Sequence, residues 1–435
     1  MSKAVRRLKS PYCFSLPHLA IMESQELIPH LLRTEFSKIT AVLSRHFGLE
    51  HLEVAEDMAG ETFLAALETW PYKGVPANPS AWLYAVAKNK AKNYLTRQHL
   101  FAEKVVPAFS DTAETLEYEI DLSETNISDS LLQMLFAVCN PVIPWEGQVA
   151  LSLRFLCGFG IEEIANAFLS NKETINKRLL RAKEKLRQEE IKIELPPANE
   201  IGKRIDTVLT TLYLLFNEGY YSESNDRVLR EELCAEAMRL VLQLIESPLT
   251  NRPPVNALFA LMCFQSSRFK ARKGNEGEMI LYDEQDHNLW DQALISRGAK
   301  HLHVASQGNE LTQYHLEASI AYWYTVKDDT PEKWENILQL FDHLLKMQYS
   351  PVAALNRAFA LAKTKGKQAA IAEAEKLQMF QNRFYYALLG DLYVDIDNQL
   401  ALSNLKKAYN MAGGEAEKCV IKKKIINLNK KLKKE

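Results

Sequence analysis

Apolar residues recur along this chain at intervals of three and four positions, the period of an α-helix that buries one face. Alternating apolar and polar runs, which are typical of half-buried strands, are scarce. Three helical stripes lie in the N-terminal part, at Leu31, Ile39, Leu43 and Phe47, at Phe63, Leu64 and Leu67, and at Leu83, Val86, Ala87, Ala91 and Leu95. The pattern predicts an all-α fold.

A further pattern, at residues 161–187, predicts two helices separated by a very short turn. The stretch reads IEEIANAFLSNKETINKRLLRAKEKLR, with Leu169 and Ser170 in the expected turn and Asn171 placed to cap the second helix. The inward positions of that second helix are Ile175, Leu179, Ala182 and Leu186. A short helix, a tight turn and a longer basic helix match the helix-turn-helix motif, whose second helix enters the DNA major groove.

The outer face of this second helix supplies candidate DNA contacts. Lysine and arginine would hold phosphates, while polar side chains near the helix N-terminus would read base edges. The candidates are Lys172, Thr174, Asn176, Lys177, Arg178 and Arg181. The alternative is an ordinary helical hairpin whose basic face lies in solvent.

Charge is unevenly distributed over the N-terminal part. Residues 50–70 contain six acidic residues and no lysine or arginine. Residues 78–98 then carry Lys88, Lys90, Lys92 and Arg97, interleaved with Trp82, Tyr84 and Tyr94. Cations follow a phosphate backbone, and aromatic rings can stack on unpaired bases. A core position for Trp82, with the lysines in solvent, explains the same pattern equally well.

Two segments predict domain boundaries. Residues 106–129 contain seven acidic residues and no lysine or arginine, so we expect a flexible acidic linker. The pair Pro196-Pro197 ends the basic helix. The predicted domains are therefore residues 22–105, 130–194 and 195–435.

The C-terminal domain contains irregular repeats. The stretches EASIAYWY, ALNRAFALAK and ALLGDLYVD place Ser319, Asn356 and Gly390 at comparable positions, each followed three residues later by an aromatic residue. Small residues at such positions let two helices approach closely, and a stack of helix pairs buries a face that one pair cannot. The pattern favours a tetratricopeptide-like domain, with another kind of α-helical domain as the alternative.

Composition limits the remaining possibilities. The chain has 435 residues and a formal net charge of -2, so several domains are expected and nucleic-acid contacts must come from local patches. Its six cysteines form no CxxC pair, which fits a reducing cytosol and argues against a zinc site. No apolar run approaches the ~20 residues that span a membrane. Met22 opens a more natural beginning than Met1, so residues 1–21 are expected to be a dispensable extension.

Enzymatic chemistry gains little support. The sequence contains no phosphate-binding loop, dinucleotide-binding fingerprint or serine-nucleophile motif. His301, His303 and His315 form the best metal-like cluster, but their spacing fixes no common face, and solvated or capping histidines are the expected reading. Neither a cofactor nor a metal is expected.

The first two domains together resemble the extracytoplasmic-function group of bacterial RNA polymerase sigma factors. AEDMAGETFLAALETW is similar to their polymerase-binding helix, and PSAWLYAVAKNKAKNYLTRQ to the helix that captures the promoter element near the start site. IEEIANAFLSNKETINKRLLRAKEKLR is similar to their C-terminal helix-turn-helix, which reads the upstream element. CNPVIPWEGQVALSLRFLCGFGIEEIANAFL and TLYLLFNEGYYSES resemble a subgroup with a large C-terminal tetratricopeptide-like extension.

Two positions depart from the family pattern. The turn of the helix-turn-helix commonly has glycine followed by an aliphatic residue, whereas this chain has Leu169 and Ser170. Asn93 stands where many relatives have an acidic residue, which bears on base preference. The promoter sequence is therefore not carried over from the family.

The resemblance implies cytoplasmic partners and the residues that contact them. Core RNA polymerase would bind Glu56, Asp57, Glu61, Phe63, Leu64 and Leu67, with the acids at the rim and the apolar residues as anchors. The separating promoter DNA strand would be held by Lys88, Asn89, Lys92, Asn93 and Arg97. A tetratricopeptide-like surface usually binds a protein or peptide, so a regulator is expected on the C-terminal domain.

A polar cluster near the start of that domain is the candidate regulatory contact. It consists of Asn217, Glu218, Gly219 and Tyr220, and Gly219 would permit a turn there. A capped loop with no partner is the alternative. For the whole chain, the alternative function is a DNA-binding regulator or tetratricopeptide adaptor that does not partner core polymerase.

Overall fold

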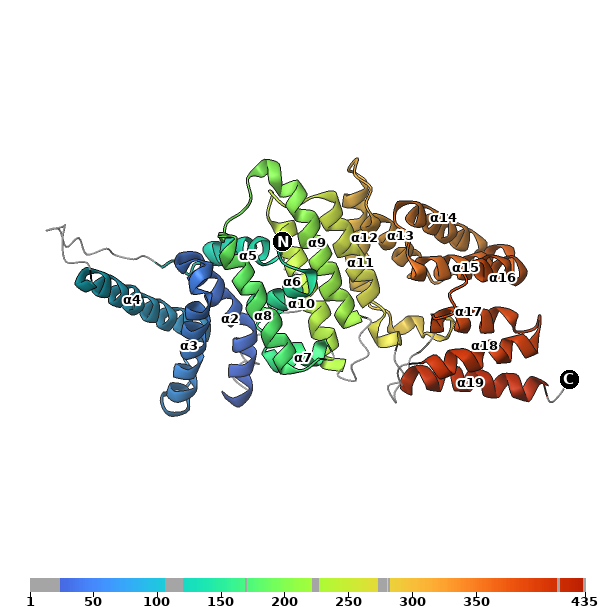
Figure 1. Cartoon of the computed structure of the whole chain (residues 1–435), viewed down its shortest axis with the longest axis horizontal. Helices are drawn as coiled ribbons and strands as arrows, with labels where there is room; N and C mark the ends of the chain where they lie inside the picture. The colour runs from blue at the N-terminus through green and yellow to red at the C-terminus, as the bar shows by residue number, and fades with distance from the viewer. Residues whose placement is uncertain are drawn as a thin grey trace, which may run out of the picture. The chain divides into compact units, whose positions relative to one another are not determined.

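The computed structural model describes residues 24–105, 120–168, 170–220, 227–272, 280, 282–412 and 415–432. All regular elements within these ranges are helices, which confirms the predicted all-α class. The chain divides into two compact units, residues 1–214 and 215–435, and the division falls inside helix α9, Ala198–Tyr220 (Figure 1). The expected extension at residues 1–21 lies outside the described residues.

The helices of the first unit, besides the start of α9, are α2 (Ser24–Phe47), α3 (Leu52–Lys73), α4 (Pro79–Val105), α5 (Glu124–Val138), α6 (Trp145–Phe155), α7 (Ile161–Ala167) and α8 (Lys172–Gln188). A single 3-10 turn, η1 (Leu49–His51), joins α2 to α3. Helices α2, α3 and α4 pack on one another and form what we call the N-terminal domain. Helices α5 to α8 and the start of α9 form the middle domain.

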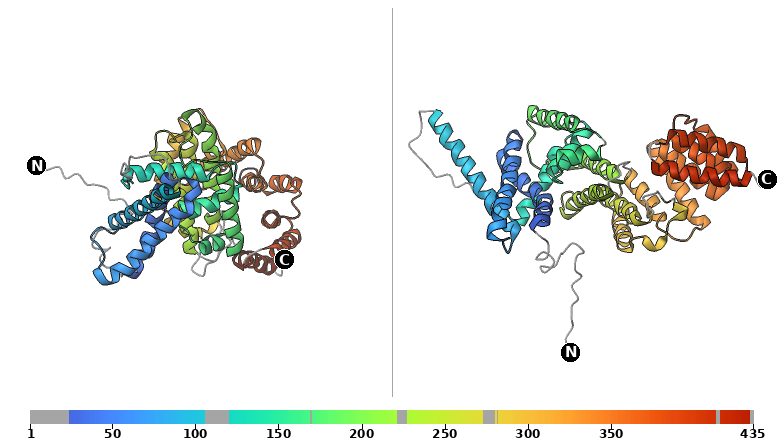
Figure 2. Two further views of the ribbon diagram at one scale, coloured as in Figure 1. Left: turned by 60° about the vertical axis from the view of Figure 1, so that its left-hand side comes forward. Right: turned by 90° about the horizontal axis from the view of Figure 1, so that it is seen from below.

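The N-terminal domain packs around a continuous apolar core. Leu43 of α2, Ala59 of α3 and Leu83 of α4 are fully buried. Trp82 is only half-buried and lies edge-on against the buried Trp70, with ring centroids 5.4 Å apart. The α2, α3 and α4 ribbons are the blue segments in Figures 1 and 2.

The middle domain begins earlier than the sequence predicted. Ser123 caps α5 by accepting a hydrogen bond from the Asn126 amide, and Ile127 is buried on the inner face of that helix. The expectation of a flexible linker over residues 106–129 is therefore wrong for residues 124–129. An N-cap and a helical apolar stripe outweigh acidic composition there. Residues 106–119 lie outside the described part of the chain.

The middle domain also ends later than predicted. Arg204 of α9 donates a hydrogen bond to the Phe136 carbonyl at 2.6 Å. Thr211 of the same helix donates to the buried Gln148 side chain at 2.7 Å. The start of α9 thus packs on the middle domain, so the boundary expected at residue 195 is wrong. The proline pair ends α8 but does not end the domain.

The helices of the second unit, after the end of α9, are α10 (Arg227–Glu246), α11 (Pro253–Ser266), α12 (Gln292–Ser306), α13 (Gln313–Trp323), α14 (Pro331–Met347), α15 (Pro351–Lys365), α16 (Lys367–Lys376), α17 (Arg383–Tyr393), α18 (Asn398–Met411) and α19 (Glu415–Leu432). Three 3-10 turns, η2 (Phe269–Arg272), η3 (Tyr282–Glu284) and η4 (His287–Leu289), lie between α11 and α12. From α10 onward each described helix packs on the next one along the chain.

Of the three small or polar repeat positions, Gly390 lies at a close helix contact. A Cβ atom added there would come within 2.7 Å of the Leu405 side chain, so α17 and α18 approach closely because residue 390 is glycine. Asn356 is instead exposed on α15, and Ser319 is half-buried with its hydroxyl bonded to the His315 carbonyl. The close helix approach expected at small repeat positions is therefore present at Gly390, whereas Asn356 lies at an exposed position.

The three histidines that formed the metal-like cluster have separate partners. His301 bonds Asn256 at 2.8 Å, His303 bonds Gln307 at 3.2 Å, and His315 bonds the Thr312 backbone and hydroxyl at the start of α13. Burial lowers the pKa of His301 and of His315. Among the described residues, no three histidine, cysteine or acidic side chains are grouped in a way that could hold a metal ion. None of the described helices is long and apolar enough to cross a membrane.

Candidate functional site

Helix α3 presents a continuous exposed surface, which we call the α3 face. It consists of Glu53, Asp57, Gly60, Glu61, Leu64 and Leu67. Their spacing of three and four residues places them on one side of the helix. Leu64 and Leu67 are 53% and 51% exposed, which is unusual for two leucines one turn apart on an otherwise well-packed helix.

Phe63, expected among the polymerase contacts, belongs to the core instead. It is 3% exposed, and its ring lies 6.5 Å from that of Phe36 on α2. The structure therefore corrects the expectation of a direct contact at this position. Asp57, Glu61, Leu64 and Leu67 remain exposed, whereas Glu56 is largely covered.

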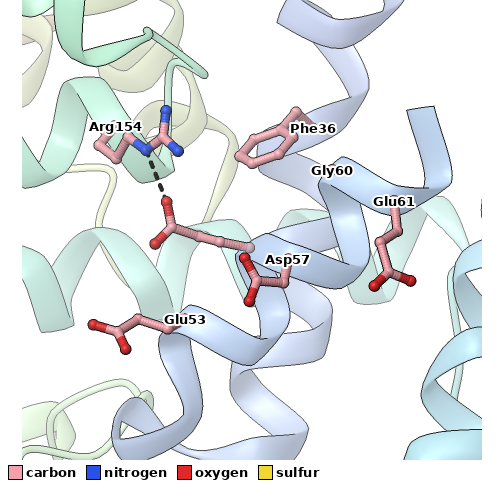
Figure 3. A pocket seen from close by; sticks show the side chains of 7 residues that line it. Phe36, Glu53, Asp57, Gly60, Glu61 and Arg154 are labelled. Carbon is pink, nitrogen blue, oxygen red and sulfur yellow. Dashed lines mark hydrogen bonds and ion pairs between the residues drawn. The ribbon is translucent and has the colours of Figure 1, made fainter. Parts of the chain in front are cut away.

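An acidic groove borders the α3 face (Figure 3). It has a volume of about 480 Å³ and is lined by Phe36, Glu53, Glu56, Asp57, Gly60, Glu61 and Arg154. The lining contains four carboxylates and one guanidinium, which favours cationic side chains. Glu61 also pairs with Lys90 of α4 at 2.7 Å.

Helix α4 carries a second exposed surface, the α4 face, consisting of Asn89, Lys92, Asn93 and Arg97. The helical period brings these four side chains together. Lys88 is half-buried and lies near enough to Asp121 to contribute to the lowered pKa of that carboxyl, whose main cause is the hydrogen bond from the Ser123 backbone. The remaining candidate strand contacts are thus assembled on one side of α4.

One side of α4 is tied to α2 by a partly buried polar contact. The Tyr84 hydroxyl donates to Glu35, which also pairs with Lys38 at 3.0 Å. Burial, reinforced by this hydrogen bond, raises the pKa of Tyr84 above its usual value. The contact fixes the orientation of α4 and therefore the direction of the α4 face.

The α7–α8 pair has the geometry predicted from its apolar pattern. Asn171 caps α8 by accepting a hydrogen bond from the Thr174 amide at 2.7 Å. The inward residues Ile175, Leu179, Ala182 and Leu186 are all buried, as predicted. Ser170 donates its amide to the Ala165 carbonyl at 2.8 Å, which closes the turn. Leu169 lies outside the described residues.

The outward residues of α8 form the α8 face, consisting of Lys172, Thr174, Asn176, Lys177 and Arg181, all exposed. Arg178 differs from them because it is half-buried, with its guanidinium 5.2 Å from the Phe168 ring centroid. One of its terminal nitrogens is buried without a hydrogen-bond partner. Arg178 therefore contributes to the packing of α7 on α8.

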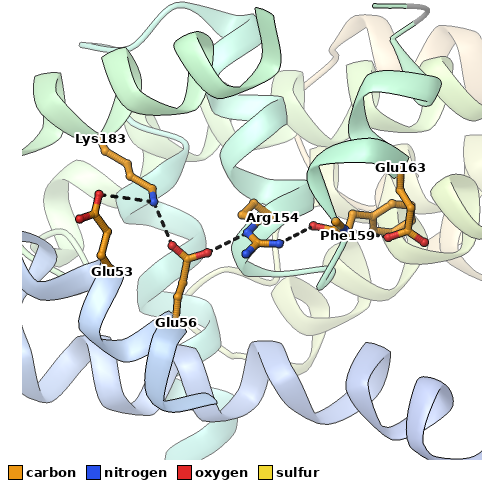
Figure 4. A network of polar contacts seen from close by, with 7 residues as sticks. Glu53, Glu56, Arg154, Phe159, Glu163 and Lys183 are labelled. Carbon is orange, nitrogen blue, oxygen red and sulfur yellow. Dashed lines mark hydrogen bonds and ion pairs between the residues drawn. The ribbon is translucent and has the colours of Figure 1, made fainter. Parts of the chain in front are cut away.

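A network of charges joins the N-terminal domain to the middle domain (Figure 4). One Glu56 oxygen accepts a hydrogen bond from Arg154 Nε at 2.7 Å, and the other accepts one from Lys183 Nζ at 2.9 Å. Lys183 also lies 3.9 Å from a Glu53 oxygen. The side chains of Glu56 and Lys183 are only 10% and 16% exposed, so this network is largely shielded from water.

Sequence reasoning missed the partners of Glu56, although a signal was present. Arg154 is the only charged residue between Val149 and Gly160, an otherwise apolar or small-residue stretch. A lone arginine in such a stretch predicts a specific partner, because an unpaired buried cation is costly. The partner itself lies 98 residues away and leaves no local pattern.

The cluster at residues 217–220 forms the last turn of α9 rather than a loop. Gly219 is helical and buried, so the expected turn at this glycine is wrong. Tyr220 is buried, with its ring 5.7 Å from Phe216 and the Arg272 guanidinium 4.1 Å from its centroid. This arrangement leaves little of Tyr220 for a regulator to contact.

Two segments of the chain match known families. Residues 31–100 match the family described as "Sigma-70 region 2", which spans the α3 and α4 faces. Residues 204–306 match a "Family of unknown function (DUF6596)". The region 2 match places the N-terminal domain with sigma factors, which are not themselves enzymes and which bind core RNA polymerase. No solved structure matches the chain significantly.

Two relatives extend this assignment. The chain is 33% identical over 351 residues to an uncharacterized protein of Rhizobium meliloti (strain 1021), covering 79% of this chain and 82% of that protein. It is 27% identical over 154 residues to the "ECF RNA polymerase sigma-E factor" of Haemophilus influenzae, covering 34% of this chain and 79% of that factor. The chain belongs to the family of the Rhizobium protein and carries a sigma-70 region 2 domain.

Proposed function

We propose that this chain is an RNA polymerase sigma factor of the extracytoplasmic-function group, which binds core polymerase and directs it to promoters. The α3 face carries the proposal: within the region 2 match, two leucines more than half exposed adjoin an acidic groove. Apolar anchors with a charged rim are typical of a protein interface. Leu64 and Leu67 would anchor the polymerase, and Asp57 and Glu61 would steer its approach.

The α4 and α8 faces are proposed to contact promoter DNA. The α4 face would hold the separating strand near the start site, where two amides and two cations suit a backbone with exposed bases. The α7–α8 pair would act as a helix-turn-helix that reads the upstream element through the α8 face. Flipping or unstacking a base costs a few kcal/mol, which stacking and phosphate contacts offset.

The C-terminal unit is proposed to regulate transcription by binding a protein or peptide on a tetratricopeptide-like stack of helices. Support comes from the close α17–α18 contact at Gly390 and from the sequential packing of α13 to α19. A truncation that tests this role should end after Leu214 rather than after Pro197, because the start of α9 packs on the middle domain.

The test is transcription by purified core polymerase on a promoter library, with and without this protein. Initiation at a specific subset of promoters is the expected result. Binding of the protein to DNA without initiation would favour the alternative, a regulator that does not partner core polymerase. A matched reaction with Leu64→Ser and Leu67→Ser together should lose initiation while the DNA-binding faces stay intact.

A further inference from the structure

Glu56 of the N-terminal domain is already bound by the chain itself. Both of its carboxylate oxygens accept charge-assisted hydrogen bonds, from Arg154 on α6 and from Lys183 on α8. Such bonds are about twice as strong as neutral ones. A polymerase cation that approaches Glu56 would therefore compete with two cations of the middle domain.

Other contacts hold the same two domains together. The Arg154 guanidinium lies 5.8 Å from the Phe36 ring centroid on α2. Arg45 at the end of α2 donates to the Asn126 side chain on α5 at 2.9 Å. Helix α2 also packs along α5 and touches α6, and η1 touches α8. The charges of the network thus lie within a broader contact between the domains.

The position of this contact relative to the α3 face determines its consequence. Glu53 and Glu56 line the acidic groove together with Asp57 and Glu61, and Arg154 forms its opposite wall (Figure 3). The middle domain therefore stands beside the surface that is proposed to receive polymerase. Helix α8 takes part through Lys183, while the α8 face on its outer side stays exposed.

We infer that Glu56, Arg154 and Lys183 form an intramolecular latch, which holds the middle domain against the N-terminal domain in the free chain and must open for core polymerase to bind. This inference rests on the proposed function. The proposed function requires the two domains to read different promoter elements at once, and the latched arrangement holds them together. A binding-competent state that is only partly populated lowers the apparent affinity in proportion to its population.

The latch should affect binding to core polymerase but not binding to duplex DNA. It sequesters an acidic residue next to the α3 face but leaves Lys172, Asn176 and Arg181 of the α8 face exposed. Breaking it should therefore raise the affinity for core polymerase without changing the affinity of the α8 face for duplex DNA. If the network only stabilised the fold, breaking it would not raise the affinity for core polymerase while leaving the affinity for duplex DNA unchanged.

The test uses Lys183→Gln, Arg154→Gln and their combination in the full chain. Lys183 belongs to neither proposed binding face, whereas Arg154 lines the acidic groove beside the α3 face. Lys183→Gln alone must therefore change polymerase binding in the same direction as the combination. Lys185→Gln is the matched control, because Lys185 lies on the same helix and pairs locally with Glu189 at 2.7 Å. Lys183→Arg, which keeps the charge, should behave like the unmodified chain. Circular dichroism establishes that each variant retains its helices.

Domain separation is measured first, without polymerase. Spin labels at Glu68→Cys on α3 and Gln188→Cys on α8, in a chain with Cys13→Ser and Cys419→Ser, report the distance between the domains by pulsed electron resonance. The unmodified chain should give a single distance population, and the Lys183→Gln and Arg154→Gln combination should add a second, longer one. An unchanged distribution in the combined variant would overturn the latch.

Polymerase binding is measured second. The combined variant should bind core polymerase roughly threefold to tenfold more tightly, mainly through faster association, because more of the chain is open before encounter. Equal or weaker binding by an opened variant would also overturn the latch. If no version binds polymerase, the proposed function fails, and the distance measurement alone still decides whether the network holds the domains together.

Discussion

Helices α3 and α8 are both amphipathic and both present a charged outer side, yet they differ in what accompanies the charge. The α3 face combines carboxylates with Leu64 and Leu67, each about half exposed. The α8 face combines cations with threonine and asparagine, and Leu180 is the one large apolar side chain that α8 exposes strongly. Binding to a protein partner is stabilised by the burial of apolar surface, whereas binding to phosphates is stabilised by positive charge.

The charges on these helices are paired in two ways. On α8, Lys177 pairs with Glu173 and Lys185 with Glu189, both one helical turn away. Lys183 of α8 instead pairs with Glu56 of α3, 127 positions away in the chain, and Glu56 also pairs with Arg154, 98 positions away. Local pairs at the surface are worth little and exchange readily, while a shielded long-range pair fixes one arrangement of domains. Charge on α3 therefore bears on conformation as well as on binding.

The largest expected effect is on the free energy of unfolding, and it distinguishes the buried Phe63 from the exposed Leu64 on α3. Phe63→Ala should lower the free energy of unfolding of the N-terminal domain by about 3–5 kcal/mol, because a large ring is removed from a closed core. Leu64→Ala should change it by less than about 0.5 kcal/mol, because that side chain is already exposed to water. Urea unfolding followed by circular dichroism measures both. Similar losses of unfolding free energy in the two variants would contradict the placement of Phe63 in the core and Leu64 at the surface.

The next effect concerns binding rather than stability. Leu64→Ser and Leu67→Ser together should weaken binding to core polymerase by about 100-fold, the size expected when interface anchors are removed. Leu249→Ser is the matched control, because Leu249 is 52% exposed and lies in the second unit. Surface plasmon resonance with immobilised core polymerase gives the affinities. If the double variant bound core polymerase as tightly as the control, the α3 face would not be part of the interface.

Where local periodicity decides the structure, the sequence was sufficient. Asn171 as the α8 cap and the four buried positions of α8 follow from spacing alone, because one cap and one stripe specify a helix and its inner face. The α4 face and the acidic side of the groove could be anticipated for the same reason, because each consists of neighbours on one helix. Phe36 of α2 and Arg154 of α6 complete the groove, and their positions depend on packing.

Where the outcome depends on distant segments, the sequence was not sufficient. Phe63 and Leu67 are one turn apart and share a face by period, yet one is buried and the other exposed. The edge of the buried arc is set by where α2 and α4 lie, which the α3 sequence does not specify. The pairing of Glu56 with Arg154 and Lys183 depends on the packing of two domains in the same way.

A smaller effect on stability compares a side chain added at a close helix contact in the second unit with one added where α3 of the first unit has open space. Gly390→Val should destabilise the second unit by about 1–3 kcal/mol, because its side chain would overlap Leu405 across the α17–α18 contact. Gly60→Ala, with no atom within 4 Å of the added Cβ, should instead stabilise α3 by about 0.5–1 kcal/mol. Differential scanning calorimetry of the full chain, with the transitions resolved, measures both signs. Stabilisation by Gly390→Val would contradict the close contact.

The smallest effect compares two arginines that lie three residues apart on α8. Arg181 is exposed, and its replacement by glutamine should lower the slope of log affinity against log salt by about 0.9, the value for one lost phosphate contact. Arg178 packs on Phe168 instead, so Arg178→Gln should change that slope much less while loosening the α7–α8 pair. Filter binding of duplex DNA over a range of salt concentrations gives the slopes, with Lys185→Gln as the control. Equal slope changes for both arginines would mean that Arg178 leaves its packing site when DNA binds, and the outer side of α8 would then be wider than its exposed residues indicate.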